Sequence, residues 1–201
     1  MRDTMQQYEA KDYSKLLGLT GFSDTLLNNH FKLYNGYVTN TNNAAKKLKD
    51  AARAGTTTEY DLAEVRRRFG WEFNGMRLHE YYFGGMSTSA AAPNDATKKA
   101  LADSFGTFEQ FQADFVGAGK ARGIGWVILA QDPQGKGLFT TWINEHDVGL
   151  LAGSHPLLVL DVFEHAYITD YQLDKPAYLN AFWKAIDWTV VGARLAGKRD
   201  D

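Results

Sequence analysis

The sequence predicts an α+β protein in which an N-terminal antiparallel hairpin of two helices precedes a mixed α/β part with a three-stranded antiparallel sheet. Apolar residues recur at helical spacing from about residue 20 to residue 83. Beyond residue 125, three short apolar runs have the length and composition of strands. A segment of small residues with one proline, 87–94, separates the two patterns. We therefore expect a helical hairpin domain over residues 1–90 and an α/β domain over residues 91–201.

Each element has its own boundary signals. Ser23 and Asp24 provide a cap for the first helix. Gly55, followed by three threonines, ends that helix and caps the second, which terminates at Gly84 and Gly85. The remaining elements are expected, in chain order, as helices over 95–104 and 107–121, strands over 126–130, 138–143 and 156–160 with a turn at 132–135 between the first two, and a closing helix over 176–192.

Composition excludes several kinds of site and partner. The chain of 201 residues has a formal net charge of −2, so no excess of positive charge points to nucleic acid or an anionic membrane. It has no cysteine, which excludes thiolate metal sites and disulfides, so a metal site would need nitrogen and oxygen ligands. Residues 1–7 carry charge and amides where a secretory signal would be apolar, and no run is long enough to span a membrane. We expect a cytoplasmic protein.

The segment 161–167, DVFEHAY, is the most informative. Asp161 and His165 stand four residues apart, so on one helical turn both side chains would point the same way. An ionised group that emerges from a buried strand needs a partner, and a metal ion is the most economical one. His30 and His79 lie on the apolar faces of the two long helices. Each alone is more often a core histidine than a ligand, but three imidazoles and one carboxylate together suit iron, manganese or zinc.

These motifs resemble the iron/manganese superoxide dismutases over nearly the whole chain. The family signature Asp-x-Trp-Glu-His-Ala-Tyr is similar to residues 161–167, and NGMRLHEYYF at residues 74–83 resembles the family's Asn-His-x-x-Phe-Trp helix. Gly123-Ile124-Gly125-Trp126 is similar to the Gly-Ser-Gly-Trp strand start, and residues 144–147 stand where the family has Asn-Gln-Asp.

The resemblance implies conversion of superoxide to dioxygen and hydrogen peroxide, with one iron or manganese ion per subunit that is alternately reduced and oxidised. Tyr37 and His146 would handle the proton, and Lys32 and Lys175 would attract the anionic substrate. The assembly implied is a homodimer or a dimer-based tetramer. The implied metal ligands are His30, His79, Asp161 and His165.

The first departure from the family pattern lies before Tyr37. The first ligand of the family stands eight residues before this tyrosine, but His30 stands seven before it, and Asn29 falls at the usual spacing. A helix bulge inserts one residue, and such bulges cluster at functional sites. Deletion of that residue predicts a regular helix over residues 28–37, with His30 inward and Asn29 away from the metal.

The second departure is His146, which replaces a glutamine that hydrogen-bonds the metal-bound solvent in the family. Gly75, four residues before His79, occupies the other place from which iron-type members supply this glutamine. We therefore expect His146 to take over the role, although its polar neighbours would equally suit an exposed loop histidine. Its imidazole would titrate closer to neutral pH than an amide does, and histidine at this place favours iron.

Further departures affect the surroundings of the metal and the dimer interface. Phe83 and Phe163 replace tryptophans of the cage around the metal, while Trp126 retains one. Leu33 and Ile168 replace a histidine and a tyrosine that bond across the family's dimer, so both ends of this bond are apolar here. The interface element that remains is Glu164, which would accept from the partner subunit's His165.

Two alternatives stay open. The chain could be a degenerate relative that binds metal as a structural or interaction module without dismutase activity, although such a role would not need an open site beside Tyr37. A mononuclear non-haem iron oxygenase would also use histidines and a carboxylate, but normally two histidines, with a pocket for an organic substrate. The expected cage of Phe83, Trp126, Trp142 and Phe163 leaves little room for one.

Overall fold

The computed structural model describes residues 7–58, 60–135 and 137–198, so all but the last residue of the predicted non-secretory N-terminus lies outside the described part. The helices are α1 (Asp24–Ala54), α2 (Tyr60–Gly84), α3 (Asp95–Phe105), α4 (Phe108–Gly119), α5 (Ile168–Tyr171), α6 (Lys175–Ala185) and α7 (Trp188–Leu195). The strands are β1 (Gly125–Gln131), β2 (Leu138–Asn144) and β3 (His155–Asp161), and short 3₁₀ turns occupy Ser14–Leu16 and Glu164–Ala166. Across the described ranges, no helix is both long and apolar enough to cross a membrane.

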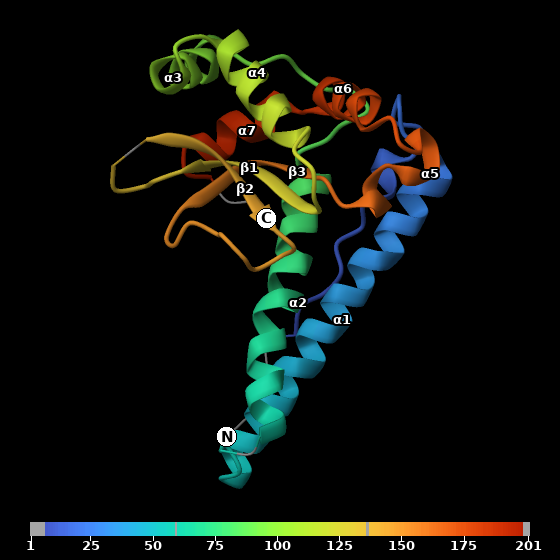
Figure 1. Ribbon diagram of the computed structural model, residues 1–201, viewed down its shortest axis with the longest axis vertical. Helices are drawn as coiled ribbons and strands as arrows, with labels where there is room; N and C mark the ends of the chain where they lie inside the picture. The colour runs from blue at the N-terminus through green and yellow to red at the C-terminus, as the bar shows by residue number, and fades with distance from the viewer. Residues whose placement is uncertain (1–6, 59, 136, 199–201) are drawn as a thin grey trace.

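The two long helices form the predicted antiparallel hairpin, which extends away from the rest of the molecule (Figure 1). Ser23 caps α1, because its hydroxyl oxygen accepts from the backbone N–H of Leu26 at 3.1 Å. Gly55, with φ of 71°, ends α1 in the left-handed conformation that favours glycine. Between these caps α1 is one α-helix, so the regular helix expected around His30 is confirmed.

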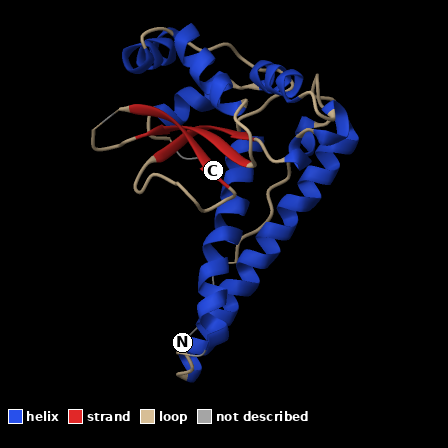
Figure 2. Cartoon of the chain, viewed as in Figure 1, coloured by secondary structure: helices blue, strands red, loops and turns tan. Residues whose placement is uncertain are grey.

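The three strands form an antiparallel sheet in the order β2-β1-β3 (Figure 2). Trp126 pairs with Ile143 on β2 and with Asp161 on β3, so these three side chains share a face. This face meets α2, because the Trp126 ring lies 4.9 Å from that of His79. The opposite face meets α4, where a Cβ at Gly119 would lie 3.1 Å from the side chain of Leu160. The sheet thus brings Asp161 against the helical hairpin.

The prediction of a single closing helix over residues 176–192 is wrong, because α6 and α7 are separate helices. Ile186 between them is extended, with φ of −62° and ψ of 122°, and forms an isolated bridge with Met86. Asp187 then caps α7 by accepting from the backbone N–H of Thr189 at 3.0 Å. The domain boundary near residue 90 falls in the segment between α2 and α3, and the division into two domains stays a prediction.

Candidate metal centre

Four predicted side chains converge from three parts of the fold. His30 comes from α1, His79 from α2, and Asp161 and His165 from the end of β3 and the turn after it. One nitrogen or oxygen atom of each lies within 4.8 Å of the others. Asp161 Oδ2 is at the centre, 3.2 Å from His30 Nε2, 3.1 Å from His165 Nε2 and 3.7 Å from His79 Nε2. Hence these residues can share one small cation.

The backbone around Asp161 differs from the single helical turn expected. Asp161 is the last residue of β3, and His165 lies in the 3₁₀ turn Glu164–Ala166. Asp161 Oδ1 accepts from the backbone N–H of Phe163 at 2.8 Å, and this bond turns the chain out of the sheet. Tyr178 donates to the backbone oxygen of Asp161 at 2.7 Å. The strand end is thereby fixed from both sides, leaving Oδ2 directed at the histidines.

The histidine nitrogens suit a metal better than they suit hydrogen bonds. His79 Nδ1 lies 2.6 Å from the carbonyl oxygen of Gly75, an acceptor, so it carries the proton and Nε2 presents its lone pair to the centre. His79 Nε2 and both ring nitrogens of His30 are buried without a hydrogen-bond partner among the described residues. Such orphaned groups cost roughly 1–3 kcal/mol each. A cation bound by these lone pairs would remove this cost, so the residues fit a metal ion.

The charge of the cluster also favours a cation. Burial lowers the pKa of His30 and lowers that of His79 further, so both imidazoles are neutral. Burial alone would raise the pKa of Asp161, but the attraction of its carboxylate to the adjacent imidazoles of His165 and then His30 outweighs burial and holds this pKa well below its ordinary value. Asp161 therefore stays ionised beside two imidazoles that burial keeps neutral, and this arrangement favours a cation.

Aromatic rings enclose the cluster. The Phe83 ring lies 4.8 Å from that of His30, the Trp126 ring 4.9 Å from that of His79, and Phe163 stacks on His165 at 5.1 Å. The three cage residues predicted from the sequence therefore surround the histidines. Trp142 does not belong to the cage, because it pairs with Val127 and projects from the other face of the sheet.

His146 is buried, so the interpretation as an exposed loop histidine is wrong. Its side chain reaches back between Tyr37 and Trp126, with Nε2 2.8 Å from Tyr37 Oη and Nδ1 3.0 Å from Trp126 Nε1. The indole can only donate, so Nδ1 accepts and the single proton of the neutral ring lies on Nε2, where it is donated to Tyr37. The phenol proton of Tyr37 is then free for another acceptor. Burial lowers the pKa of His146 to about 4, below the near-neutral titration expected.

Gly75 makes room for Tyr37. A Cβ at Gly75 would lie 2.6 Å from Cδ1 of the Tyr37 ring, closer than real contacts allow. Tyr37 in turn stacks on His79 with ring centroids 5.1 Å apart. No larger side chain fits at Gly75 unless Tyr37 moves, which explains why this helix position supplies no glutamine here.

Two residues of the site were missed by the sequence analysis. The Trp71 ring lies 4.4 Å from that of His146, and Trp71 Nε1 donates to Glu145 at 3.1 Å. The spacing of Trp71, Gly75 and His79 by four residues places all three on one row of α2 and could have indicated Trp71. Nothing in the sequence indicates Glu145, because this contact depends on the turn after β2.

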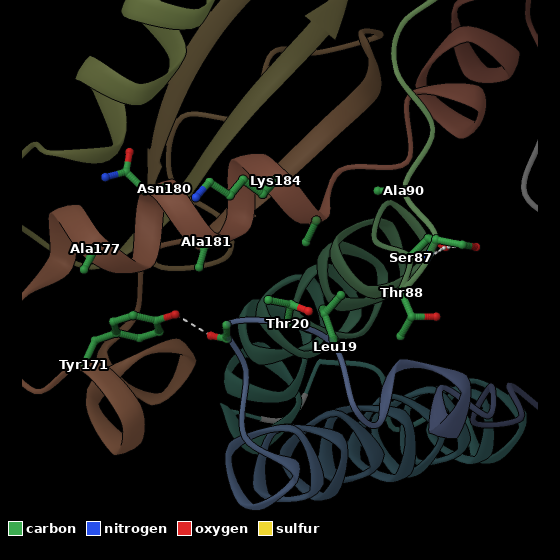
Figure 3. A pocket seen from close by; sticks show the side chains of 13 residues that line it. Leu19, Thr20, Ser87, Thr88, Ala90, Tyr171, Ala177, Asn180, Ala181 and Lys184 are labelled. Carbon is green, nitrogen blue, oxygen red and sulfur yellow. Dashed lines mark hydrogen bonds between the residues drawn. The ribbon is translucent and has the colours of Figure 1, made fainter.

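A cleft and a larger cavity lie outside the cluster of the four converging side chains. A cleft of about 250 Å³ is lined by Glu164 and three cations, Lys120, Arg122 and Lys175. A larger cavity of about 590 Å³ lies between α6, residues 19–21 and the segment after α2, where the Tyr171 hydroxyl donates to the carbonyl oxygen of Gly21 (Figure 3). This larger cavity contains none of the converging residues.

Comparison with known proteins gives consistent matches. Residues 93–194 match the family model described as iron/manganese superoxide dismutases, C-terminal domain. The chain is 33% identical to an iron superoxide dismutase of Aquifex pyrophilus, over 95% of this chain and 92% of the relative. It is 35% identical to one of Cupriavidus metallidurans, over 89% and 90% of the two chains. A manganese superoxide dismutase of Halobacterium salinarum is 34% identical over 82% of this chain and 81% of its own length.

Proposed function

Because the chain belongs to the iron/manganese superoxide dismutase family, we propose that it converts superoxide to dioxygen and hydrogen peroxide with one iron or manganese ion per subunit. The observation that carries the proposal is the convergence of three imidazoles on Asp161 Oδ2, with buried nitrogens that lack other partners. Asp161 and His165, with His30 and His79, would hold the ion.

The chemistry that such an ion supplies when bound is one-electron exchange, as acceptor from one superoxide and as donor to a second. The balanced reaction consumes two superoxide anions and two protons and yields one dioxygen and one hydrogen peroxide. Asp161 offsets part of the charge of the cation, and the Gly75 carbonyl fixes the ring of His79 through Nδ1–H. The rings of Phe83, Trp126 and Phe163 line this region and would limit the access of water to it.

The protons would pass through Tyr37, because its hydroxyl hydrogen is free once His146 donates to Tyr37 Oη. Burial raises the pKa of Tyr37 far above its ordinary value, so the hydroxyl stays protonated at neutral pH. His146 thus acts through Tyr37 and keeps the phenol oriented.

Iron is the metal that we propose for the resident ion. Support comes from His146 at the place of the usual glutamine, and from the iron-type names of the relatives in Aquifex pyrophilus and Cupriavidus metallidurans. Manganese is the competing ion, since the relative from Halobacterium salinarum is named for it. Metal analysis after expression in medium with equal iron and manganese distinguishes the two.

The cleft with three cations supports a route for the anionic substrate. Burial lowers the pKa of Lys175 while the charge of Asp161 opposes that effect, so the lysine lies within electrostatic reach of the metal site. Lys175 Nζ donates to the carbonyl oxygen of Ala121 at 3.0 Å, which holds it at the cleft. Lys32 is exposed on α1 and would act only at longer range.

A homodimer, alone or as half of a tetramer, completes the proposal. Leu33, Ile124 and Ile168 are apolar side chains that are 37%, 38% and 44% exposed, as expected for a surface covered by a second copy. The side chain of Glu164 is exposed, and its carboxylate forms no hydrogen bond or ion pair within the described residues, so it could accept from the partner subunit's His165. We also propose a cytoplasmic location, which cell fractionation tests.

Metal analysis of the purified protein together with a superoxide-consumption assay tests the function. We expect close to one iron or manganese ion per chain and consumption that scales with metal content. If the protein binds the metal stoichiometrically but leaves the rate of superoxide decay unchanged, it is a metal-binding module without dismutase activity. If its activity requires an organic substrate, it is a non-haem iron oxygenase.

A further inference from the structure

Trp71 lies beside the Tyr37–His146 pair but has no part in the chemistry described above. It is one helical turn before Gly75 on α2, and Tyr37 lies over that glycine. The Trp71 ring centroid is 5.4 Å from that of Tyr37 and 4.4 Å from that of His146. The indole therefore forms one wall of the pair.

The turn that carries His146 is fastened to α2 through the same indole. Trp71 Nε1 donates to Glu145 Oε2 at 3.1 Å. Glu145 has φ of +52°, a left-handed conformation that is uncommon for a residue with a side chain. The turn is closed by backbone hydrogen bonds of 3.0 and 3.3 Å between Asn144 and Val148. A non-glycine residue held in this conformation directly before a functional histidine suggests a positional constraint.

Burial in this turn is confined to His146. Its ring is fully buried, while the residues on both sides, Glu145 and Asp147, are exposed. The outer side of Trp71 is itself covered, because the guanidinium carbon of Arg68 lies 3.7 Å from the centre of the indole ring. Arg68 is held there by a hydrogen bond of 2.8 Å to Glu72. Arginine and indole thus form two layers between this side of His146 and water.

We propose that Trp71 is a positioning residue for the proton path: its N–H fixes the His146 turn through Glu145, and its ring shields the Tyr37–His146 hydrogen bond from water. This inference rests on the proposed function for its catalytic consequence, but the placement of His146 can be tested independently. Trp71 touches neither the converging ligand atoms nor the cation cleft, so its loss should leave metal binding intact.

The test combines histidine footprinting with kinetics on the metal-loaded protein. Diethyl pyrocarbonate modifies accessible imidazoles, and peptide mass spectrometry gives the labelling rate of His146, with the exposed His155 as internal reference. In Trp71→Ala we expect the labelling rate of His146 to rise roughly tenfold. We also expect kcat for superoxide to fall roughly tenfold with KM unchanged, because proton transfer through Tyr37 depends on the position of His146.

Two milder variants separate the hydrogen bond from the shielding ring. Trp71→Phe keeps a ring but loses the N–H, and Glu145→Gly removes the acceptor while relieving the left-handed backbone. Both should reduce kcat by a similar factor of about three, with metal content equal to the parent, because each loses the same hydrogen bond but retains a ring over His146. Phe69→Ala is the matched control, since this half-buried aromatic on α2 packs on Phe73 and not on the pair.

The outcomes are distinguishable. Parent-like labelling of His146 in Trp71→Ala overturns the shielding role, and a parent-like kcat in all three variants overturns the positioning role. If Trp71→Ala does not fold, the two milder variants decide the question through kcat. A parent protein that does not consume superoxide would defeat the proposed function, while the labelling contrast would still show whether Trp71 covers His146.

Discussion

The imidazole of His146 has a single proton when neutral, and its contacts determine where that proton goes. Trp126 donates to Nδ1, so Nε2 donates to Tyr37, and the hydroxyl hydrogen of Tyr37 is released for the metal side of the site. A glutamine amide carries two hydrogens and can serve two acceptors at once. With histidine in place of glutamine, one donor is lost, and the Tyr37 hydroxyl is the only group of the pair whose hydrogen is not already donated within it.

Burial of His146 predicts a loss of stability in acid. Its pKa is about 4 in the folded chain against an ordinary value of 6.5, so the unfolded state binds the proton first and stability falls as pH drops below about 6.5. This contribution is intact at pH 7, and roughly 2 kcal/mol of it is lost at pH 5. In His146→Gln the contribution is absent, so the difference in unfolding free energy between parent and variant should change by this amount in denaturant titrations. The same pH dependence of unfolding free energy in parent and variant would contradict this prediction. Because the pKa of His146 is about 4, we also expect no titration of His146 in the activity profile near neutral pH.

Removal of a converging side chain should remove the metal as well. In His79→Ala or Asp161→Ala we expect metal content and superoxide consumption to fall together to a few per cent or less. Each variant keeps only three of the four ligands, so the charge and the coordination of the metal ion are incompletely satisfied and the ion is lost. Elemental analysis of the purified variants measures this. Asn29→Ala is the control, since Asn29 is exposed next to His30. Full metal occupancy in Asp161→Ala would exclude Asp161 as a ligand.

Two glycines of α2 should respond in opposite ways to alanine. At Gly75 the added methyl meets the Tyr37 ring at 2.6 Å, so we expect a loss of about 1–3 kcal/mol from overpacking and a lower kcat as Tyr37 is displaced. At Gly70 nothing lies within 4 Å of the new Cβ, so the same change should stabilise the helix by about 0.5–1 kcal/mol. Chemical denaturation of both variants compares them directly, and equal effects would show that Tyr37 does not depend on Gly75.

At the scale of elements, local signals predicted where most helices and strands lie. Ser23 and Gly55 bound α1 as expected, because caps act within one turn of the chain. The break between α6 and α7 was missed, although Asp187 is a capping residue, because apolar periodicity continues through Ile186. The bridge from Ile186 to Met86, a hundred residues away, decides this break, and such a contact has no local signal.

The start of α1 provides a prediction at this scale. Besides capping the helix, Ser23 donates through its hydroxyl to Asp170 Oδ1 at 2.6 Å and through its N–H to Oδ2 at 2.7 Å. Ser23→Ala should therefore lower the unfolding free energy by about 1 kcal/mol. Thermal melts of the two variants measure this. Thr25→Ala, a change at an exposed position of the first turn, should lower the melting temperature less than Ser23→Ala does. Equal melting temperatures for parent and Ser23→Ala would show that the cap contributes nothing.

For the whole molecule, the sequence motifs predicted the ligand candidates but not how they meet. The hairpin and the α+β class follow from periodicity, and the four converging residues follow from the family resemblance. The approach of α2 to β3, which brings His79 near Asp161, depends on packing across the sheet. No motif indicates the contact between Trp71 and Glu145, because the two residues meet only after the turn following β2 folds against α2.

Assembly of two copies supplies the prediction at the largest scale. If Glu164 accepts from the partner subunit's His165, Glu164→Ala should weaken dimerisation and lower activity in parallel, since the bond fixes the orientation of a ligand. Sedimentation velocity across a dilution series, with activity measured on the same samples, tests this. Glu109→Ala serves as control, because Glu109 is exposed on α4. A Glu164→Ala variant that sediments as a normal dimer with full activity would exclude the bridge.

Three of the four converging side chains, His30, His79 and Asp161, have at most 1% of their surface exposed, and they come from α1, α2 and β3. An ion held between them could leave only if these elements separated, so its exchange rate would be that of an opening of the fold. Under such kinetic control, the metal present while the chain folds decides which ion the protein carries. Equilibrium affinity, which follows a fixed order among divalent metals, would then matter less than the supply of metal in the cell at the moment of synthesis.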